Sequence, residues 1–167
     1  MYKKIISIAL CAAIGICMCA CSDSDSSGSS SSSSAAASSE SELSAQDILE
    51  KAASETMTEK AFFSDEKFQN NINKLYGIDA DKLEDGGIVY GNSGSADEIS
   101  VLKLKDDSSA KKVLEARVEY RATQFQNYKP SEMPKIDAAQ IFEEGGYWFL
   151  IIADDPDPIH QTIDDMM

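Results

Sequence analysis

The chain has 167 residues, with 15 Lys and Arg against 29 Asp and Glu, which gives a formal net charge of −14 at pH 7. So acidic a surface repels nucleic acid and anionic lipid head groups, which excludes a nucleic-acid-binding protein and a protein held to a membrane by surface charge. The four cysteines all lie between Cys11 and Cys21, too close together for a disulfide framework, and no distant cysteine offers a partner.

Residues 1–20 have the pattern of a secretory signal peptide. Lys3 and Lys4 precede an uncharged apolar run over residues 5–18, and small residues follow it. The alternative is an uncleaved membrane anchor, but the run falls short of the ~20 residues that span a bilayer.

The end of this run, "MCAC" at residues 18–21, resembles the lipobox of bacterial lipoproteins. The resemblance implies that the thiol of Cys21 is acylated and that the chain is cut before it. Stable attachment needs more than one acyl chain. The predicted partner is therefore the membrane, reached through Cys21, and the predicted location is the outer, extracytoplasmic side of the cell membrane.

Residues 21–44 continue from Cys21 into a tract dominated by Ser. Such a composition cannot bury apolar surface and predicts a disordered linker. Its root-mean-square reach is ~25–30 Å, which holds a folded domain near the membrane and leaves it free to reorient.

Residues 45–167 are predicted to form one globular domain. Ser44 and Asp47 indicate a capping box before a first helix, and a second helix should run from Asp65 to Gly77. Further predicted elements are strands at 86–91 and 98–105, a long helix at 109–128, two strands in 138–155 around a Gly145-Gly146 turn, and a short helix after Asp155-Pro156.

This order of elements predicts an α+β fold, with a small antiparallel sheet of about four strands in two hairpins, packed with helices. Phe62 and Phe63 are expected to be buried. In the last strand, Trp148, Leu150 and Ile152 point to one face, and Tyr147, Phe149 and Ile151 to the other. Because both sets are apolar, either helices cover both faces of the sheet or one face is left as a binding patch.

The succession of "KLYGID", "GIVYGNSGSADEISVLKLKD", "FQNYKPSEMPKI" and "GGYWFLIIADD" resembles the lipoproteins that carry the domain of unknown function 4358, found mainly in Gram-positive-type bacteria. The resemblance covers most of residues 45–155. It implies an extracytoplasmic lipoprotein and supplies no catalytic residue.

The sequence offers no catalytic constellation, metal site or cofactor motif. His160 is the one histidine and is ordinary in a tail helix, and "GNSGS" at 91–95 lacks the Lys of a phosphate-binding loop and is expected to be a turn. "DDPDP" at 154–158 lacks the ligand spacing of a calcium loop, so capping and solvation explain it.

The long helix carries one less ordinary pattern. Arg117 and Arg121 fall within the apolar stripe formed by Ala110, Leu114, Phe125 and Tyr128, and no acid on the same helix can reach them. In a structural role, the aliphatic part of each arginine would cover apolar surface, and its guanidinium would reach water or form an ion pair. In a functional role, the two arginines would form an anion-binding site. A carboxylate partner would come from another element, and the candidates are Glu98, Glu143 and Asp154.

Two functions are compatible with these features. The favoured one is a membrane-anchored, extracytoplasmic lipoprotein that acts as a non-catalytic binding or interaction module, with a protein or cell-envelope partner. The alternative is a cell-envelope hydrolase that acts on cell-wall glycan or peptide, which requires a cleft with a carboxylate of displaced pKa.

Overall fold

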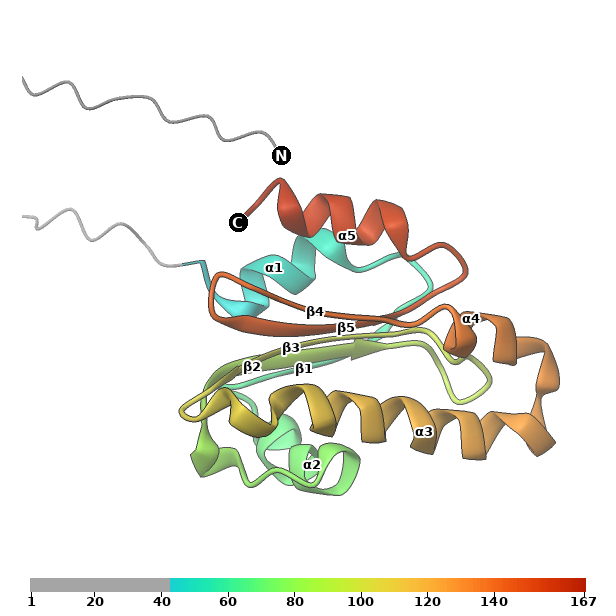
Figure 1. Cartoon of the computed structure of the whole chain (residues 1–167), viewed down its shortest axis with the longest axis horizontal. Coiled ribbons are helices and arrows are strands. Elements are labelled where there is room, and N and C mark those ends of the chain that lie inside the picture. Colours follow the sequence, from blue (N-terminus) through green and yellow to red (C-terminus); the bar gives the residue numbers. More distant parts are fainter. Residues whose placement is uncertain (1–42) are drawn as a thin grey trace, which may run out of the picture. The chain divides into compact units, whose positions relative to one another are not determined.

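The structure is a computed structural model that describes residues 43–167 (Figure 1). The predicted signal peptide, the lipidation site Cys21 and residues 22–42 of the predicted linker lie outside the described residues. The helices and strands, in chain order, are α1 (Ala45–Ala52), β1 (Glu59–Phe62), α2 (Glu66–Tyr76), β2 (Leu83–Tyr90), β3 (Glu98–Leu104), α3 (Ala110–Tyr128), α4 (Met133–Asp137), β4 (Gln140–Glu144), β5 (Tyr147–Ile152) and α5 (Asp157–Asp164). Short 3-10 turns occur at Ala80–Lys82, Asp107–Ser109 and Pro130–Glu132.

The strands form one antiparallel sheet in the order β1-β2-β3-β5-β4, so the predicted α+β class and both hairpins are confirmed. The sheet has five strands where about four were expected. The additional strand is β1, an edge strand of four residues that is too short to show a recognisable alternation. Phe62 and Phe63, which were expected to be buried, are half-buried because they lie at the end of this edge strand.

Helices cover both faces of the sheet, so neither face is left as an open patch. Figure 1 shows α1 and α5 on one face and α2 and α3 on the other. The predicted alternation of β5 is confirmed: Leu150 and Ile152 pack in the core beneath α2 and α3, and Phe149 and Ile151 pack in the core beneath α1 and α5.

Two glycines in β2 let both helical layers approach the sheet closely. A Cβ atom at Gly87 would lie 2.5 Å from Cδ1 of Leu49 in α1, and one at Gly86 would lie 2.9 Å from Cζ of Phe68 in α2. Any side chain at these positions would displace a core residue.

The point where the chain enters the domain and the loop between β2 and β3 lie at opposite ends of the sheet. Leu43 enters the domain at the end where Gly145 and Gly146, both with positive φ, turn the chain from β4 into β5, and the backbone carbonyl of Leu43 accepts a hydrogen bond from Tyr147 Oη (3.1 Å). Ser44 then forms the predicted capping box with Asp47. The loop between β2 and β3 lies at the opposite end (Figure 1).

Candidate functional site

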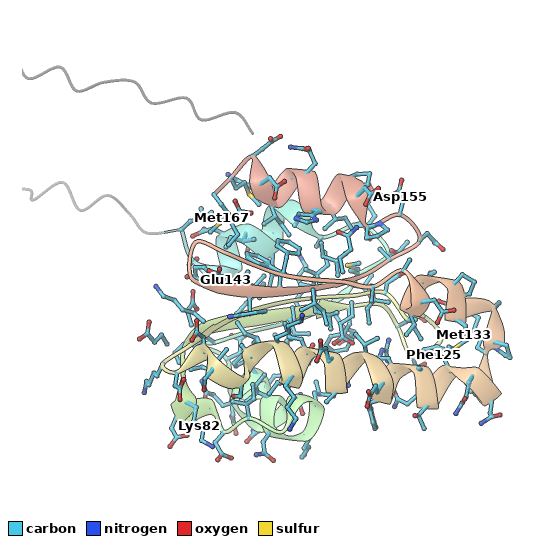
Figure 2. All side chains as sticks on the ribbon, in the orientation of Figure 1. Lys82, Phe125, Met133, Glu143, Asp155 and Met167 are labelled. Carbon is cyan, nitrogen blue, oxygen red and sulfur yellow. The ribbon has the colours of Figure 1, made fainter. Side chains whose placement is uncertain are left out.

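A pocket of about 610 Å³ opens at the end of the sheet where β2 turns into β3. Side chains from the sheet and from the helices meet between the two layers (Figure 2). The pocket lies over β1, β2 and β3 and between α2 and α3, and most of its lining is polar or aromatic: Glu59, Asn71, Leu75, Tyr90, Gly91, Asn92, Ser93, Ser95, Glu98, Arg117, Tyr120, Arg121 and Gln124.

Strand register and helix periodicity bring these residues together. Glu59 pairs with Tyr90, and Tyr90 pairs with Glu98, so the three side chains form a row across β1, β2 and β3 on one face. The lining residues of α3 lie three or four positions apart and therefore share one side of the helix. α2 completes the opposite wall.

A buried ion pair forms the floor of the pocket. The side chain of Glu98 is completely buried and accepts two hydrogen bonds from Arg117, from Nε to Oε1 (2.8 Å) and from Nη2 to Oε2 (2.7 Å). Tyr76 Oη donates a further hydrogen bond to Oε1. The guanidinium of Arg117 also lies over the rings of Tyr76 and Tyr120, at 5.2 Å and 5.5 Å from their centroids. This geometry is bidentate and leaves Glu98 no free oxygen.

Ionisation of these groups follows from their burial. Burial opposes the charge on Arg117, but the hydrogen bonds and attraction of Glu98 outweigh it and raise the pKa of Arg117 above its usual value. Burial, together with the negative charge of Glu98, raises the pKa of Tyr76 well above its usual value. The centre therefore holds a charged pair and a neutral phenol.

Arg121 lies beside this pair and shares the single carboxylate of Glu98 with Arg117. Its Nε is 3.4 Å from Glu98 Oε2 but is not aligned for a hydrogen bond. Nη2 donates to the carbonyl of Ser95 (3.0 Å) and Nη1 to Oε1 of Gln124 (3.3 Å). Burial lowers the pKa of Arg121, and repulsion from Arg117 adds to this, so that the attraction of Glu98 is outweighed. Since an arginine remains protonated in proteins, the pocket contains an excess positive charge.

The structure thus brings Arg117 and Arg121 together at Glu98, one of three candidate acids. The other two are elsewhere: Glu143 accepts a hydrogen bond from the backbone of Gly146, and Asp154 forms an ion pair with Lys135. Sequence reasoning missed Tyr76 and the α2 wall. One available signal was Glu98 itself, an acidic residue opening an otherwise apolar strand.

Two other residues singled out from the sequence lie outside this site. Tyr128 was placed on the apolar stripe but is 73% exposed, since it ends α3 beyond the edge of the sheet. His160 stacks on Phe142 and hydrogen-bonds Gln140, a structural role between α5 and β4.

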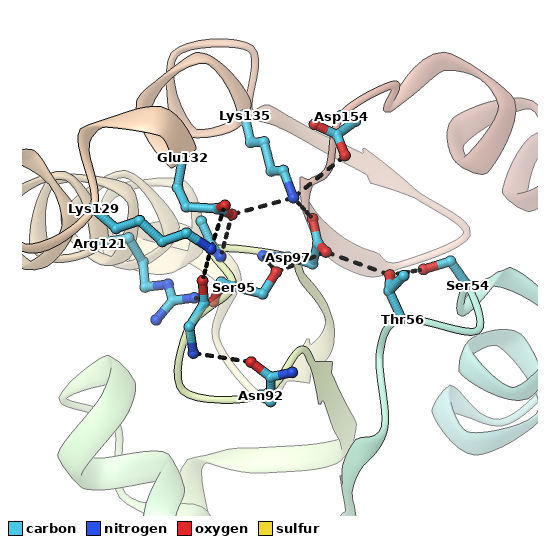
Figure 3. A network of polar contacts seen from close by, with 12 residues as sticks. Ser54, Thr56, Asn92, Ser95, Asp97, Arg121, Lys129, Glu132, Lys135 and Asp154 are labelled. Atoms are coloured by element: carbon cyan, nitrogen blue, oxygen red, sulfur yellow. Dashed lines mark hydrogen bonds and ion pairs between the residues drawn. The ribbon is translucent and has the colours of Figure 1, made fainter.

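The loop that borders the pocket is fastened by its backbone (Figure 3). Lys129 Nζ donates to the carbonyl of Gly94 (2.6 Å), and Arg121 donates to that of Ser95. The backbone N–H of Ala96 donates to Glu132 Oε2 (3.0 Å). "GNSGS" is a turn, as expected, and these bonds also make it a fixed rim of the pocket.

Behind the loop, Lys135 joins three carboxylates. Its Nζ lies 2.9 Å from Asp97 Oδ1, 3.2 Å from Glu132 Oε2 and 3.3 Å from Asp154 Oδ2 (Figure 3). Burial acts to raise the pKa of Glu132, but the hydrogen bonds from Ala96, Lys129 and Lys135 outweigh it and lower the pKa to about 2. This network ties α4 to the start of β3 and so fixes the loop in place.

A family model described as a domain of unknown function (DUF4358) matches residues 63–153, more than half of the chain. The chain belongs to the DUF4358 family. No curated protein and no solved structure matched it.

The DUF4358 match runs from the end of β1 to the end of β5 and contains every residue of the pocket except Glu59. The site is therefore built from the part of the chain that defines the family, whereas α1 and α5 lie outside it. Within residues 43–167 of this DUF4358 protein, no helix is long and apolar enough to cross a membrane, and no group of His, Cys, Asp and Glu side chains is arranged so that it could hold a metal ion.

Proposed function

We propose that the protein is an extracytoplasmic lipoprotein, anchored to the cell membrane through Cys21, that binds a small polar ligand in the α2–α3 pocket without catalysis. The observation that supports it most is the preformed pocket in which two arginines, Arg117 and Arg121, share the one carboxylate of Glu98. Its volume lies within the ~300–1,000 Å³ of small-molecule sites.

The rigidity of the site supports binding. The rim loop is held at three backbone groups, and the floor is a bidentate ion pair, so little ordering is needed when a ligand enters. Preorganisation of this kind favours affinity because fewer side chains lose freedom on binding.

The arrangement of carboxylates weighs against the alternative of a cell-envelope hydrolase. Both oxygens of Glu98 are taken by Arg117 and Tyr76, and Glu59 at the rim pairs with Lys67 (2.8 Å). General acid–base catalysis needs a carboxyl group free to exchange a proton with substrate.

Site-specific photo-crosslinking in the membrane-anchored full chain tests this proposal. A photoreactive residue in place of Tyr120 should capture a low-mass component of the cell envelope, which mass spectrometry then identifies. The matched control replaces Glu115, an exposed residue of α3 outside the pocket. Identical products at both positions, or none at Tyr120, would contradict a ligand-binding function.

Catalysis is tested separately with the same preparation. Incubation with cell-wall glycan and peptide should release no product, and release that depends on Glu98 would favour the hydrolase instead.

A further inference from the structure

We propose that the ligand of the α2–α3 pocket carries a single carboxylate, bound by Arg121. This inference rests on the proposed function and names the class of ligand that the pocket selects.

The charge inside the pocket sets the charge of the ligand. Arg117 and Arg121 contribute two positive charges and Glu98 one negative charge, while the Glu59–Lys67 pair at the rim is neutral. One positive charge is left over, which one carboxylate would match. A phosphate monoester carries a charge of about −1.5 to −2, which is more than the one positive charge of the pocket would neutralise. The excess negative charge would add to the net charge of −14 of the chain.

Unused hydrogen-bond donors show where the carboxylate would bind. Nη1 of Arg117 finds no acceptor among residues 43–167, but protein atoms enclose it, so the carboxylate is left to Arg121, whose side chain is 12% exposed against 4% for Arg117. A guanidinium has five N–H groups, and those of Arg121 that donate within the described chain are on Nη1 and Nη2 alone. A carboxylate can accept from two guanidinium N–H groups at once.

The rest of the lining indicates what is attached to the carboxylate. The rings of Tyr90 and Tyr120 form apolar walls beside the arginines. The remaining polar lining consists of amide and hydroxyl side chains, from Asn71, Asn92, Ser93, Ser95 and Gln124. Such side chains hydrogen-bond hydroxyl or amide groups, and a ring packs against the face of a sugar or a peptide unit. An acidic sugar and a peptide C-terminus share this chemistry.

Titration calorimetry of the full chain in detergent compares acids with their own amides. The probes are D-glucuronate against D-glucuronamide, N-acetylalanine against N-acetylalaninamide, and inorganic phosphate. In at least one pair the acid should bind at least tenfold more tightly than the amide. Arg121→Gln should weaken the acid about tenfold or more, and Arg121→Lys should weaken it less. Lys112→Gln, which removes an equal charge from an exposed position of α3, should leave binding unchanged.

Each outcome bears on the inference. Preference for D-glucuronate identifies an acidic sugar, preference for N-acetylalanine identifies a peptide C-terminus, and equal binding shows that the carboxylate alone decides. An amide that binds as tightly as its acid, tighter binding of phosphate, or unaltered affinity in Arg121→Gln with an unaltered melting temperature would overturn the carboxylate while leaving the pocket a binding site. Failure of every probe would overturn it too, and the crosslinking at Tyr120 then decides independently whether the pocket binds a ligand.

Discussion

At the scale of single residues, Glu98 joins the side chains that form the floor of the pocket. It is a completely buried carboxylate at the start of β3, held by Arg117, approached by Arg121 and hydrogen-bonded by Tyr76. A buried charge is tolerated only when it is paired, and a bidentate arginine is the strongest partner available to a carboxylate. The whole floor of the site therefore depends on one acid.

Glu98→Gln should destabilise the protein by about 3–5 kcal/mol, because it leaves the charge of Arg117 buried without a counter-ion. Urea unfolding of the single and double variants measures this. The double variant Glu98→Leu with Arg117→Met should recover most of the loss, since apolar groups of similar size can replace a buried pair. If the losses in the single variants Glu98→Leu and Arg117→Met simply add in the double variant, the two residues do not depend on each other.

At the scale of elements, the close packing of α1 on β2 depends on Gly87. Gly87→Ala should cost about 1–3 kcal/mol, because the new methyl group would lie 2.5 Å from Leu49 Cδ1 and force the helix outward. Gly94→Ala serves as the control, since its methyl group would meet Asn92 Oδ1 at an ordinary 3.4 Å. Thermal unfolding compares the two, and an equal effect would show that the layers have room to adjust.

The network that fixes the rim loop should make stability depend on acid pH. The pKa of Glu132 is about 2 in the folded protein, against an ordinary value of 4.5. Its contribution is therefore complete above about pH 4.5 and is lost as the pH falls toward 2. We expect this loss to be on the order of 1–2 kcal/mol, because Lys129 is partly exposed and screened.

Melting temperatures of wild type and Glu132→Gln between pH 6 and pH 2 test this point. The difference between the two proteins should shrink as the pH falls, since protonation makes the wild-type side chain as neutral as Gln. A difference that stays constant over the whole range would show that the charge of Glu132 is not what holds the loop.

Local signals predict some of these elements and not others. α2 lies where Asp65 and Gly77 placed it, and Gly77 adopts the expected left-handed conformation (φ 68°). Asp65, however, does not cap the helix with its side chain but accepts a hydrogen bond from the backbone of Phe62. β1 was missed because a four-residue edge strand gains its stability from pairing with β2 rather than from its own pattern.

Part of the candidate site also follows from local sequence signals, and the rest depends on tertiary packing. Helical periodicity alone places Arg117 and Arg121 on one side of α3. The choice of Glu98 over Glu143 or Asp154 depends on strand register and on the way α3 crosses the sheet, which no local pattern encodes. The contribution of Tyr76 from α2 is likewise a product of tertiary packing.

At the scale of the whole molecule, the N-terminal anchor remains to be tested. Cys21→Ala should release the protein from the membrane or mislocalise it, because the proposed acyl chains are attached there. Cys19→Ala is the matched control, since Cys19 lies before the proposed cleavage point and should leave the mature protein unchanged. Mass spectrometry of the mature N-terminus should show an acylated Cys21, and an unmodified Cys21 that still follows residues 1–20 would contradict the anchor.

The chain enters the domain at one end of the sheet, and the pocket lies at the other. The polypeptide joins the domain at Leu43, beside the β4–β5 turn, and the pocket opens at the far end, a strand of eight residues and roughly 25 Å away. The length of the sheet therefore separates the pocket from the point where the chain enters the domain. A ligand can therefore enter the pocket and reach Arg121 without passing the end of the domain at which Leu43 enters.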